Sequence, residues 1–313
     1  MPFTLCPRYH QSVSPKTPIT RRELLQKSAT LGGGAVALSA VVAACGGDSK
    51  TSTAGAFALD ESIVVVKRFP DSALVPGEVR LPISLANDAS ILGSDDLPDV
   101  LTGKIVNLET GEVVNDAITA TKHQGNAPTP YWPFIATISE PGMYKIVVDG
   151  ANPDGAAMQI AAAAEVSLPI PGDPLPLVVT PTLDNPMDMD PMCTLTPSAC
   201  PLHRTSVDQA LKAGMPVVYL IGTPAHCTTG TCAPALEYLV DIAAEFESRA
   251  TFIHTEVYQD KGATKVTPAV TDYYMTFEPA LFITDSNGIL RVRLDSVFDE
   301  EEIRDALARV GVS

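Results

Sequence analysis

Short runs of apolar and β-branched residues, separated by turn residues, fill the chain from residue 57 to about residue 166. They include SIVVVKRF, EVRLPISLAN, TGKIVNLE, WPFIATIS and MYKIVVDG, with VPGE, LETGE and EPGM among the separators. Alternation of apolar and polar positions between turn signals is typical of half-buried strands. Seven or so short strands at this spacing predict an antiparallel β-sandwich. The start of the later stretch AAMQIAAAAEV can supply its last strand.

After residue 173 the pattern changes to strands that alternate with helices, which indicates an α/β domain. The segment LPIPGDPLP, with four prolines in nine residues, marks the boundary. We therefore expect a sandwich at 57–167, a linker at 168–173 and an α/β domain at 174–313.

Within the α/β domain the expected elements follow from local periodicity and capping signals. The expected strands are LPLVVTPT, MPVVYLIGT and ATFIHTEVY, and EPALFITDSNGILRVRLD is expected to form a hairpin that turns at Asn287–Gly288. The expected helices are TSVDQALKAG, CAPALEYLVDIAAEFESR and DEEEIRDALARV. Acidic residues in the first turn of the last helix suit its dipole and are expected to face solvent.

The first 56 residues do not have the pattern of a fold. Arg21 and Arg22 precede an apolar run at 28–44, and VAAC ends that run at Cys45. This combination resembles a twin-arginine signal peptide (1–44) that ends in a lipobox. The resemblance implies cleavage before Cys45, a lipid on its thiol and a position on the extracytoplasmic face of the bacterial cytoplasmic membrane. Residues 45–56 are expected to be a flexible tether.

Composition narrows the possible partners. The chain has 313 residues, of which 45% are hydrophobic, and a formal net charge of −16. Nucleic-acid binding requires a positive surface, so we expect no nucleic-acid partner. The acidity is typical of a soluble extracytoplasmic protein.

Cysteine usage directs attention to the second domain. Of six cysteines, Cys6 leaves with the signal and Cys45 carries the lipid. The remaining four form two close pairs, and an even number in an oxidising compartment favours disulfides. Cys193 and Cys200 enclose six residues, and we expect a structural disulfide between them.

The stretch TPAHCTTGTCAP holds the second pair, Cys227 and Cys232, between an expected strand and an expected helix. Pro234 is tolerated only in the first turn of that helix, so Cys232 is expected at the positive helix end and Cys227 in the loop before it. Free N–H groups there favour a thiolate. His226, when protonated, would stabilise a neighbouring thiolate further.

The order of strands and helices, this cysteine pair and Glu278–Pro279 before the hairpin together resemble the thioredoxin superfamily over residues 174–313. The resemblance implies that the bond before Pro279 is cis and that Pro279 packs against the cysteine pair. It also implies that Glu278 faces the cysteines, where a carboxylate disfavours a neighbouring thiolate. The spacing departs from the family, which has two residues between the cysteines where this chain has four.

The first domain resembles immunoglobulin-like domains in architecture. SEPGMYKIVV is similar to their tyrosine corner, so Tyr144 is expected to bond back to the main chain. Trp132, the only tryptophan, is expected to pack in the core or at its rim. The domain contains no catalytic constellation and is interpreted as a spacer or a partner-binding domain.

The leading functional hypothesis is a membrane-tethered thiol–disulfide oxidoreductase that acts on extracytoplasmic protein thiols and disulfides without a cofactor or a metal. Cys227 is expected to attack and Cys232 to resolve. The alternative is a non-catalytic binding or assembly module in which both cysteine pairs are structural.

Two minor alternatives remain. The stretch also resembles peroxiredoxins of the bacterioferritin-comigratory type, although one residue is inserted and Leu220 stands at their proline position. Sco-type copper chaperones pair Cys-x-x-x-Cys with a distant histidine, and the candidate here is His254, which is expected to be packed in the core. Met187, Met189, Met192 and His203 offer soft ligands for Cu(I), but an apolar flap is the favoured interpretation of the methionines.

Overall fold

The computed structural model describes residues 59–93 and 96–313. The expected signal peptide, with Arg21 and Arg22, and the expected lipidation at Cys45 lie outside the described residues, as does the expected tether. No helix in the described ranges has both the length and the apolar character needed to span a bilayer.

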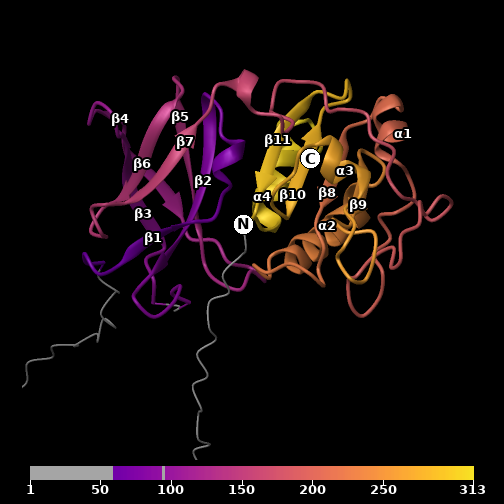
Figure 1. Ribbon diagram of the computed structural model, residues 1–313, viewed down its shortest axis with the longest axis horizontal. Coiled ribbons are helices and arrows are strands. Elements are labelled where there is room, and N and C mark those ends of the chain that lie inside the picture. The colour runs from indigo at the N-terminus through magenta and orange to yellow at the C-terminus, as the bar shows by residue number, and fades with distance from the viewer. Residues whose placement is uncertain (1–58, 94–95) are drawn as a thin grey trace, which may run out of the picture. The chain divides into compact units, whose positions relative to one another are not determined.

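Seven strands form two antiparallel sheets in the first half of the described chain (Figure 1). One sheet has the order β1-β2-β5 and the other β4-β3-β6-β7. The expected β-rich first part is therefore present. The strands are β1 Val64–Lys67, β2 Gly77–Ala86, β3 Val100–Asn107, β4 Val113–Thr121, β5 Trp132–Ile138, β6 Gly142–Val148 and β7 Ala156–Ile160.

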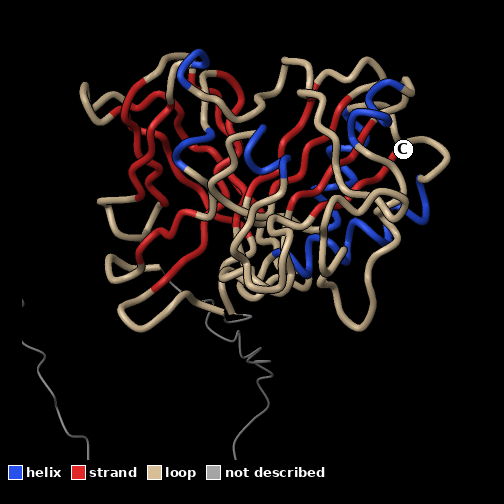
Figure 2. Tube along the Cα trace, turned by 45° about the vertical axis from the view of Figure 1, so that its right-hand side comes forward, coloured by secondary structure: helices blue, strands red, loops and turns tan. Residues whose placement is uncertain are grey.

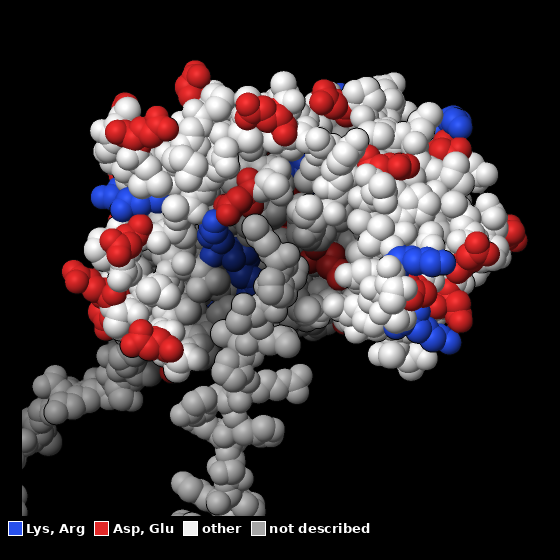
Figure 3. Space-filling view, in the orientation of Figure 1, with Lys and Arg blue, Asp and Glu red and all other residues white. Residues whose placement is uncertain are grey.

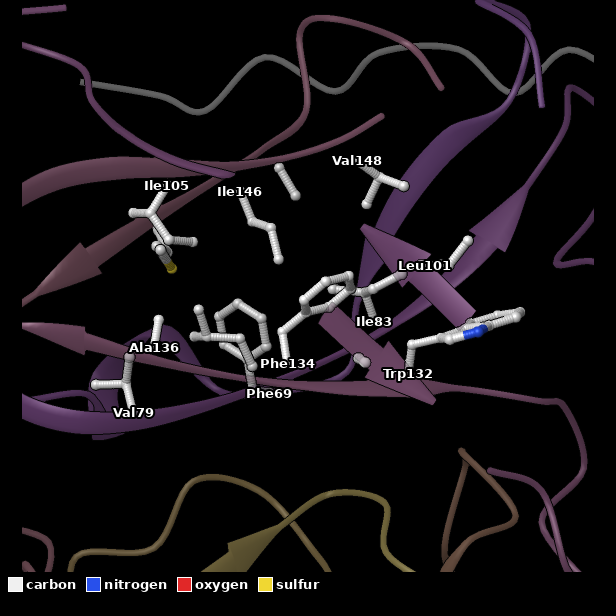
Figure 4. Packing of buried hydrophobic residues seen from close by; sticks show 14 of the residues in the cluster. Phe69, Val79, Ile83, Leu101, Ile105, Trp132, Phe134, Ala136, Ile146 and Val148 are labelled. Carbon is white, nitrogen blue, oxygen red and sulfur yellow. The ribbon is translucent and has the colours of Figure 1, made fainter. Parts of the chain in front are cut away.

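The two sheets share one core, in which side chains from both inner faces meet (Figure 4). Trp132 is fully buried there, as expected, and its indole N–H donates to the carbonyl of Pro98 at 3.1 Å. The hydroxyl of Tyr144 donates to the carbonyl of Glu140 at 3.0 Å, which confirms the expected corner. Because both buried polar atoms are hydrogen-bonded, neither ring incurs the cost of an unpaired donor.

The second half contains one four-stranded sheet with the order β11-β10-β8-β9, in which only β8 and β9 run parallel. In register, Tyr219 of β8 lies opposite Phe282 of β10 and Ile253 of β9. The strands are β8 Val217–Ile221, β9 Thr251–Thr255, β10 Ala280–Thr284 and β11 Leu290–Asp295. The helices are α1 Val207–Lys212, α2 Cys232–Phe246, α3 Pro268–Asp272 and α4 Glu300–Arg309.

Helices cover both faces of this sheet, and every residue of β8 and β10 is therefore buried. Val218 and Leu220 pack with residues of α2 and α4 on one face. Val217, Tyr219 and Ile221 pack with residues of α1 and α3 on the other. Figure 2 shows the sheet strands in red with helices in blue beside them. A continuous apolar strand between two helical layers is the pattern expected of a buried α/β strand.

Two details of the sequence interpretation need correction. LPLVVTPT (175–182) forms no strand: an isolated bridge joins the preceding residue, Pro174, to Ile289, and the N–H of Leu175 donates to the carbonyl of Gly288. Prolines at 174, 176 and 181 remove the N–H groups that a ladder would need. In addition, α3 lies between the expected strand ATFIHTEVY and the expected hairpin, where no helix was expected from the sequence. From 166 to 206 the described chain has neither helix nor strand.

A buried ion-pair cluster, which we call the clasp, joins the sandwich to α4. Arg80 of β2 donates from Nε and Nη2 to the two carboxylate oxygens of Glu302, each at 2.7 Å. The hydroxyl of Tyr131 donates to Glu302 at 2.8 Å, and His123 Nδ1 lies 2.8 Å from a carboxylate oxygen of Asp299. The acidic start of the last helix, expected to face solvent, thus contributes two carboxylates to the clasp. The described residues, 59–93 and 96–313, accordingly belong to one compact unit.

Acidic side chains are scattered over the face shown in Figure 3 and do not gather in one patch. With 37 acidic and 21 basic residues in the chain, this distribution fits the interpretation of the net charge as a solubility feature.

Because the clasp is buried, we expect the substitution of Arg80 alone to lower the free energy of unfolding strongly. The side chains of Arg80 and Glu302 are each 12% exposed. Removing one partner leaves a buried charge unpaired, so Arg80→Ala should lower the free energy of unfolding by about 3–5 kcal/mol in chemical denaturation. Replacing both Arg80 and Glu302 with Met should recover much of that loss, because no charge is then left buried.

The matched control is Arg304→Ala, which removes an arginine whose partners are exposed carboxylates of Glu245 and Glu300. Its cost should stay at or below about 1 kcal/mol. Equal losses for Arg80→Ala and Arg304→Ala would show that the clasp contributes no more than a surface ion pair.

Candidate functional site

The loop between β8 and α2 carries the cysteine pair. Cys232 is the first residue of α2, and Thr231 precedes it at the N-cap position. Pro234 lies in the first helical turn, where its missing N–H costs nothing. Cys227 lies five residues before Cys232 in the loop, as the sequence predicts. Both are free thiols in this structure.

Cys227 is half-buried and surrounded by hydrogen-bond donors. Its sulfur lies 3.3 Å from the backbone N–H of Cys232 and 3.2 Å from the hydroxyl of Thr229. Hydrogen bonding with the side chain of Cys232, assisted by Thr229 and by backbone N–H groups at the helix start, lowers the pKa of Cys227 to about 4 against the opposing effect of burial. A thiol with this pKa is a thiolate at neutral pH, and the thiolate is the nucleophilic form.

Cys232 has the opposite character. It is only 1% exposed, and its thiol donates to a carboxylate oxygen of Glu278 at 3.5 Å. Burial, and then the neighbouring Cys227 and Glu278, raise the pKa of Cys232 far above its usual range. The two sulfurs of the pair therefore have different roles available: one is charged and accessible, and the other is protonated and enclosed.

Glu278 faces the pair as expected, but it contacts Cys232 and not Cys227. The same oxygen that accepts from Cys232 also accepts from the backbone N–H of Thr223 at 2.6 Å. Burial raises the pKa of Glu278, and the charge of Cys227 acts in the same direction. A half-buried carboxyl with a raised pKa next to a protonated thiol is a suitable proton acceptor for that thiol.

Gly222 brings Pro279 and Cys232 together. A Cβ atom at Gly222 would lie 3.3 Å from Cβ of Pro279 and 3.6 Å from the sulfur of Cys232. The peptide bond before Pro279 is cis, as expected. A Cβ at residue 222 would therefore crowd Pro279 and make an ordinary contact with Cys232, so glycine eases the packing against Pro279.

The role expected for His226, stabilisation of a neighbouring thiolate when protonated, stays a prediction. The ring of His226 packs edge-on against Tyr258, with 5.7 Å between ring centroids. Among the described residues, no hydrogen bond joins the ring of His226 to the sulfur of Cys227. The groups that stabilise the thiolate are Cys232, the hydroxyl of Thr229 and backbone N–H groups at the helix start, of which the sequence indicated the N–H groups.

A cleft of about 440 Å³ opens beside Cys227 and Glu278. Its wall includes His226 from the loop before α2, Tyr258 from the segment after β9, and Met275 and Phe277 near the start of the hairpin. Apolar and aromatic walls with a few polar groups are typical of sites that bind another molecule.

The first cysteine pair lies in a second buried cluster. Cys193, Cys200, His203 and His254 place their ligand atoms within 4.8 Å of one another. Hydrogen bonding with Cys200, supported by the two histidines, lowers the pKa of Cys193 although burial opposes it. Both cysteines are free thiols here, and the disulfide expected between them stays a prediction.

His254 is fully buried, as expected, and its neighbours were missed by sequence reasoning. Its Nδ1 faces Cys193 and Cys200, at 3.8 and 3.4 Å from the two sulfurs, and its Nε2 bonds the carbonyl of Gly222 at 2.8 Å. Among the described residues, no hydrogen bond joins the imidazole of His254 to Cys227 or Cys232. The Cys-x6-Cys-x2-His spacing was the signal that could have revealed this cluster.

No family model matches this chain, and a search of curated proteins finds none that is significantly similar to it.

The site predicts a pH profile for one thiol. With a pKa of about 4, Cys227 should react with iodoacetamide at a nearly constant rate from about pH 8 to about pH 6 and lose reactivity as the pH falls through 4. An ordinary thiol, with a pKa near about 8.5, would lose reactivity over the whole of that upper range. Peptide mapping by mass spectrometry after timed alkylation measures the rate at Cys227 alone.

Cys232→Ala is the matched variant, because it removes the first cause of the lowered pKa. It should move the midpoint of the Cys227 profile upward, whereas Cys232→Ser keeps a donor and should move it less. A wild-type profile with its midpoint near 8.5 would show that the loop does not stabilise the thiolate.

Proposed function

We propose that the protein is a thiol–disulfide oxidoreductase that exchanges electrons with protein partners through Cys227 and Cys232. The observation that carries this proposal is the asymmetry of the pair: an accessible thiol with a pKa of about 4 beside a buried thiol with a raised pKa. The sulfurs of Cys193 and Cys200 also have opposite pKa shifts, but both are buried, so the exposure of Cys227 beside a cleft is what distinguishes this pair. Redox-active pairs combine an accessible thiolate with a second thiol within reach.

The exchange is balanced without a cofactor. The Cys227 thiolate attacks one sulfur of a partner disulfide, whose S–S bond breaks and releases a partner thiolate. Cys232 then attacks the Cys227 sulfur of the mixed disulfide and expels the second partner thiolate. The chain loses two electrons and gains the Cys227–Cys232 disulfide, while the partner becomes a dithiol. The same steps in reverse oxidise a partner dithiol.

The second step requires Cys232 to lose its proton, and Glu278 is the group in position to accept it. The Cys232 thiol already donates to this carboxylate. Burial raises the pKa of Glu278, and a base whose pKa lies closer to neutrality is a better acceptor at neutral pH. In the proposal Glu278 therefore takes the proton of the resolving cysteine, Cys232. It does not act by disfavouring the thiolate of Cys227.

The fold assignment belongs to the same proposal. We propose that residues 174–313 are thioredoxin-like and that residues 57–167 are immunoglobulin-like. The sheet β11-β10-β8-β9 with helices on both faces, and the position of the cysteines between β8 and α2, support the first part. The paired antiparallel sheets and the Tyr144 corner support the second.

A trapping experiment tests the oxidoreductase. Cys232→Ser removes the resolving sulfur, so mixed disulfides between Cys227 and partner proteins should accumulate on non-reducing gels of cells under oxidative folding load. Cys227→Ser should give little adduct, because the buried Cys232 is a poor nucleophile. Trapped species are identified by their loss on reduction and by mass spectrometry.

The control is the equilibrium of the wild-type pair in glutathione buffers of graded poise. A redox-active pair should titrate above about −300 mV, whereas a pair that remains oxidised below that value behaves as a structural bond. Adducts through Cys232 alone would reverse the roles of the two cysteines. Absence of adducts from both variants would favour the non-catalytic binding module.

We further propose that the protein is anchored by a lipid on Cys45 at the extracytoplasmic face of the membrane. The arginine pair, the apolar run and the VAAC sequence support this proposal. Cys45→Ser should abolish lipid labelling and release the protein from the membrane fraction. Replacing Arg21 and Arg22 with Lys should stop export without lowering synthesis. Export of the double-Lys variant at normal yield would indicate a general secretory route.

A further inference from the structure

The second cysteine cluster has the composition and the geometry of a metal site. Cys193, Cys200 and His203 come from the irregular segment before α1, and His254 comes from β9. All four residues are at most 8% exposed. The sulfur of Cys200 lies 3.2 Å from Nε2 of His203 and 3.4 Å from Nδ1 of His254, and the sulfur of Cys193 lies 3.8 Å from Nδ1 of His254.

These separations match the edges of a zinc tetrahedron. Zinc bonds are about 2.3 Å to sulfur and about 2.0–2.1 Å to nitrogen, which places tetrahedral sulfur and nitrogen ligands about 3.6 Å apart. Three of the four sulfur–nitrogen distances of the cluster range from 3.2 to 3.8 Å, and the fourth is within 4.8 Å. A metal ion can therefore be held with only small movements of the side chains.

Surrounding groups orient the ligands. The Nε2 of His254 bonds the carbonyl of Gly222 at 2.8 Å, which leaves Nδ1 directed at the two sulfurs. A ligating histidine commonly donates its other nitrogen in this way. The residue after Cys193 is held as well, since the backbone N–H of Thr194 donates to the buried Glu256 at 2.7 Å.

We propose that Cys193, Cys200, His203 and His254 bind one Zn²⁺ ion as a closed structural site. On binding, the two thiols release their protons, and two thiolates and two neutral imidazoles then neutralise the ion. Tetrahedral S₂N₂ ligation favours zinc over Cu(I), and four protein ligands leave no position for a substrate. This site is independent of Cys227 and Cys232 and goes beyond the proposed redox function.

The ion would fasten the longest irregular segment of the described chain. Residues 166–206 contain no helix or strand, and they supply three of the four ligands. Segments of this length without secondary structure are uncommon in compact domains unless something holds them. Zinc would join the segment to β9 through His254, whereas the expected Cys193–Cys200 disulfide would only close a loop within the segment. The two solutions exclude each other, because both consume the same sulfurs.

The experiment uses the full-length wild-type chain, purified anaerobically without chelators. Elemental analysis should find about one zinc per chain. Native mass spectrometry should show the mass of one Zn²⁺ less two protons, and denatured protein should show Cys193 and Cys200 as alkylatable thiols. Cobalt substituted for zinc should give the visible bands of a tetrahedral thiolate site. None of these measurements depends on redox activity.

Variants locate the ion. His203→Ala should lose zinc, whereas His203→Cys supplies a thiolate ligand and should retain it. The matched control is the double variant Cys227→Ser/Cys232→Ser, which should keep a full zinc content. The proposal is overturned by a wild-type chain with a Cys193–Cys200 disulfide and no metal, by reduced chain that binds no added zinc, or by zinc lost from the double variant. Preferential recovery of Cu(I) would overturn the identity of the ion.

Discussion

The main chain at Gly222 is the constraint on which both thiol clusters depend. On one side, the absence of a Cβ lets Pro279 and the sulfur of Cys232 approach closely. On the other, the carbonyl of Gly222 holds the imidazole of His254 beside the first cysteine pair. Its N–H continues the pairing with β9 by donating to Thr255 at 3.1 Å. One residue without a side chain thus fixes the relative positions of two chemically different sites.

The two cysteine pairs show how environment decides the chemistry of the same residue type. Cys227 lies in a loop at a helix start, next to a cleft, where donors stabilise a negative sulfur. Cys193 and Cys200 lie under a long segment, enclosed with two imidazoles. Accessibility and donors suit exchange with a partner, whereas enclosure and nitrogen ligands suit a structural link. A single hydrogen bond, from the N–H of Ala225 to the hydroxyl of Thr194, connects the two loops.

Elements with strong local signals could be predicted from the sequence. The strand β8, the helix α2 and the hairpin of β10 and β11 follow from periodicity, and the site pair Cys227–Cys232 was found at its observed position. Contacts between distant residues could not be predicted in the same way. The cluster around His254 depends on the path of an irregular segment, and nothing in a β-strand pattern shows which loop will cover it. The strand expected at LPLVVTPT was predicted from its apolar residues. The prolines at 174, 176 and 181, which prevent a β-ladder, were given too little weight in that prediction.

The clasp also has a consequence for the order in which the chain matures. Arg80 and Glu302 are separated by 222 positions, and α4 is translated after every other described element. A ribosome-bound chain can pair all seven strands of the sandwich while the guanidinium of Arg80 still has no carboxylate. Contacts of such long sequence separation form late and slow folding. The sandwich therefore reaches its full stability only once the carboxyl-terminal helix has emerged, so that a chain truncated before residue 302 would be weakened in its amino-terminal domain.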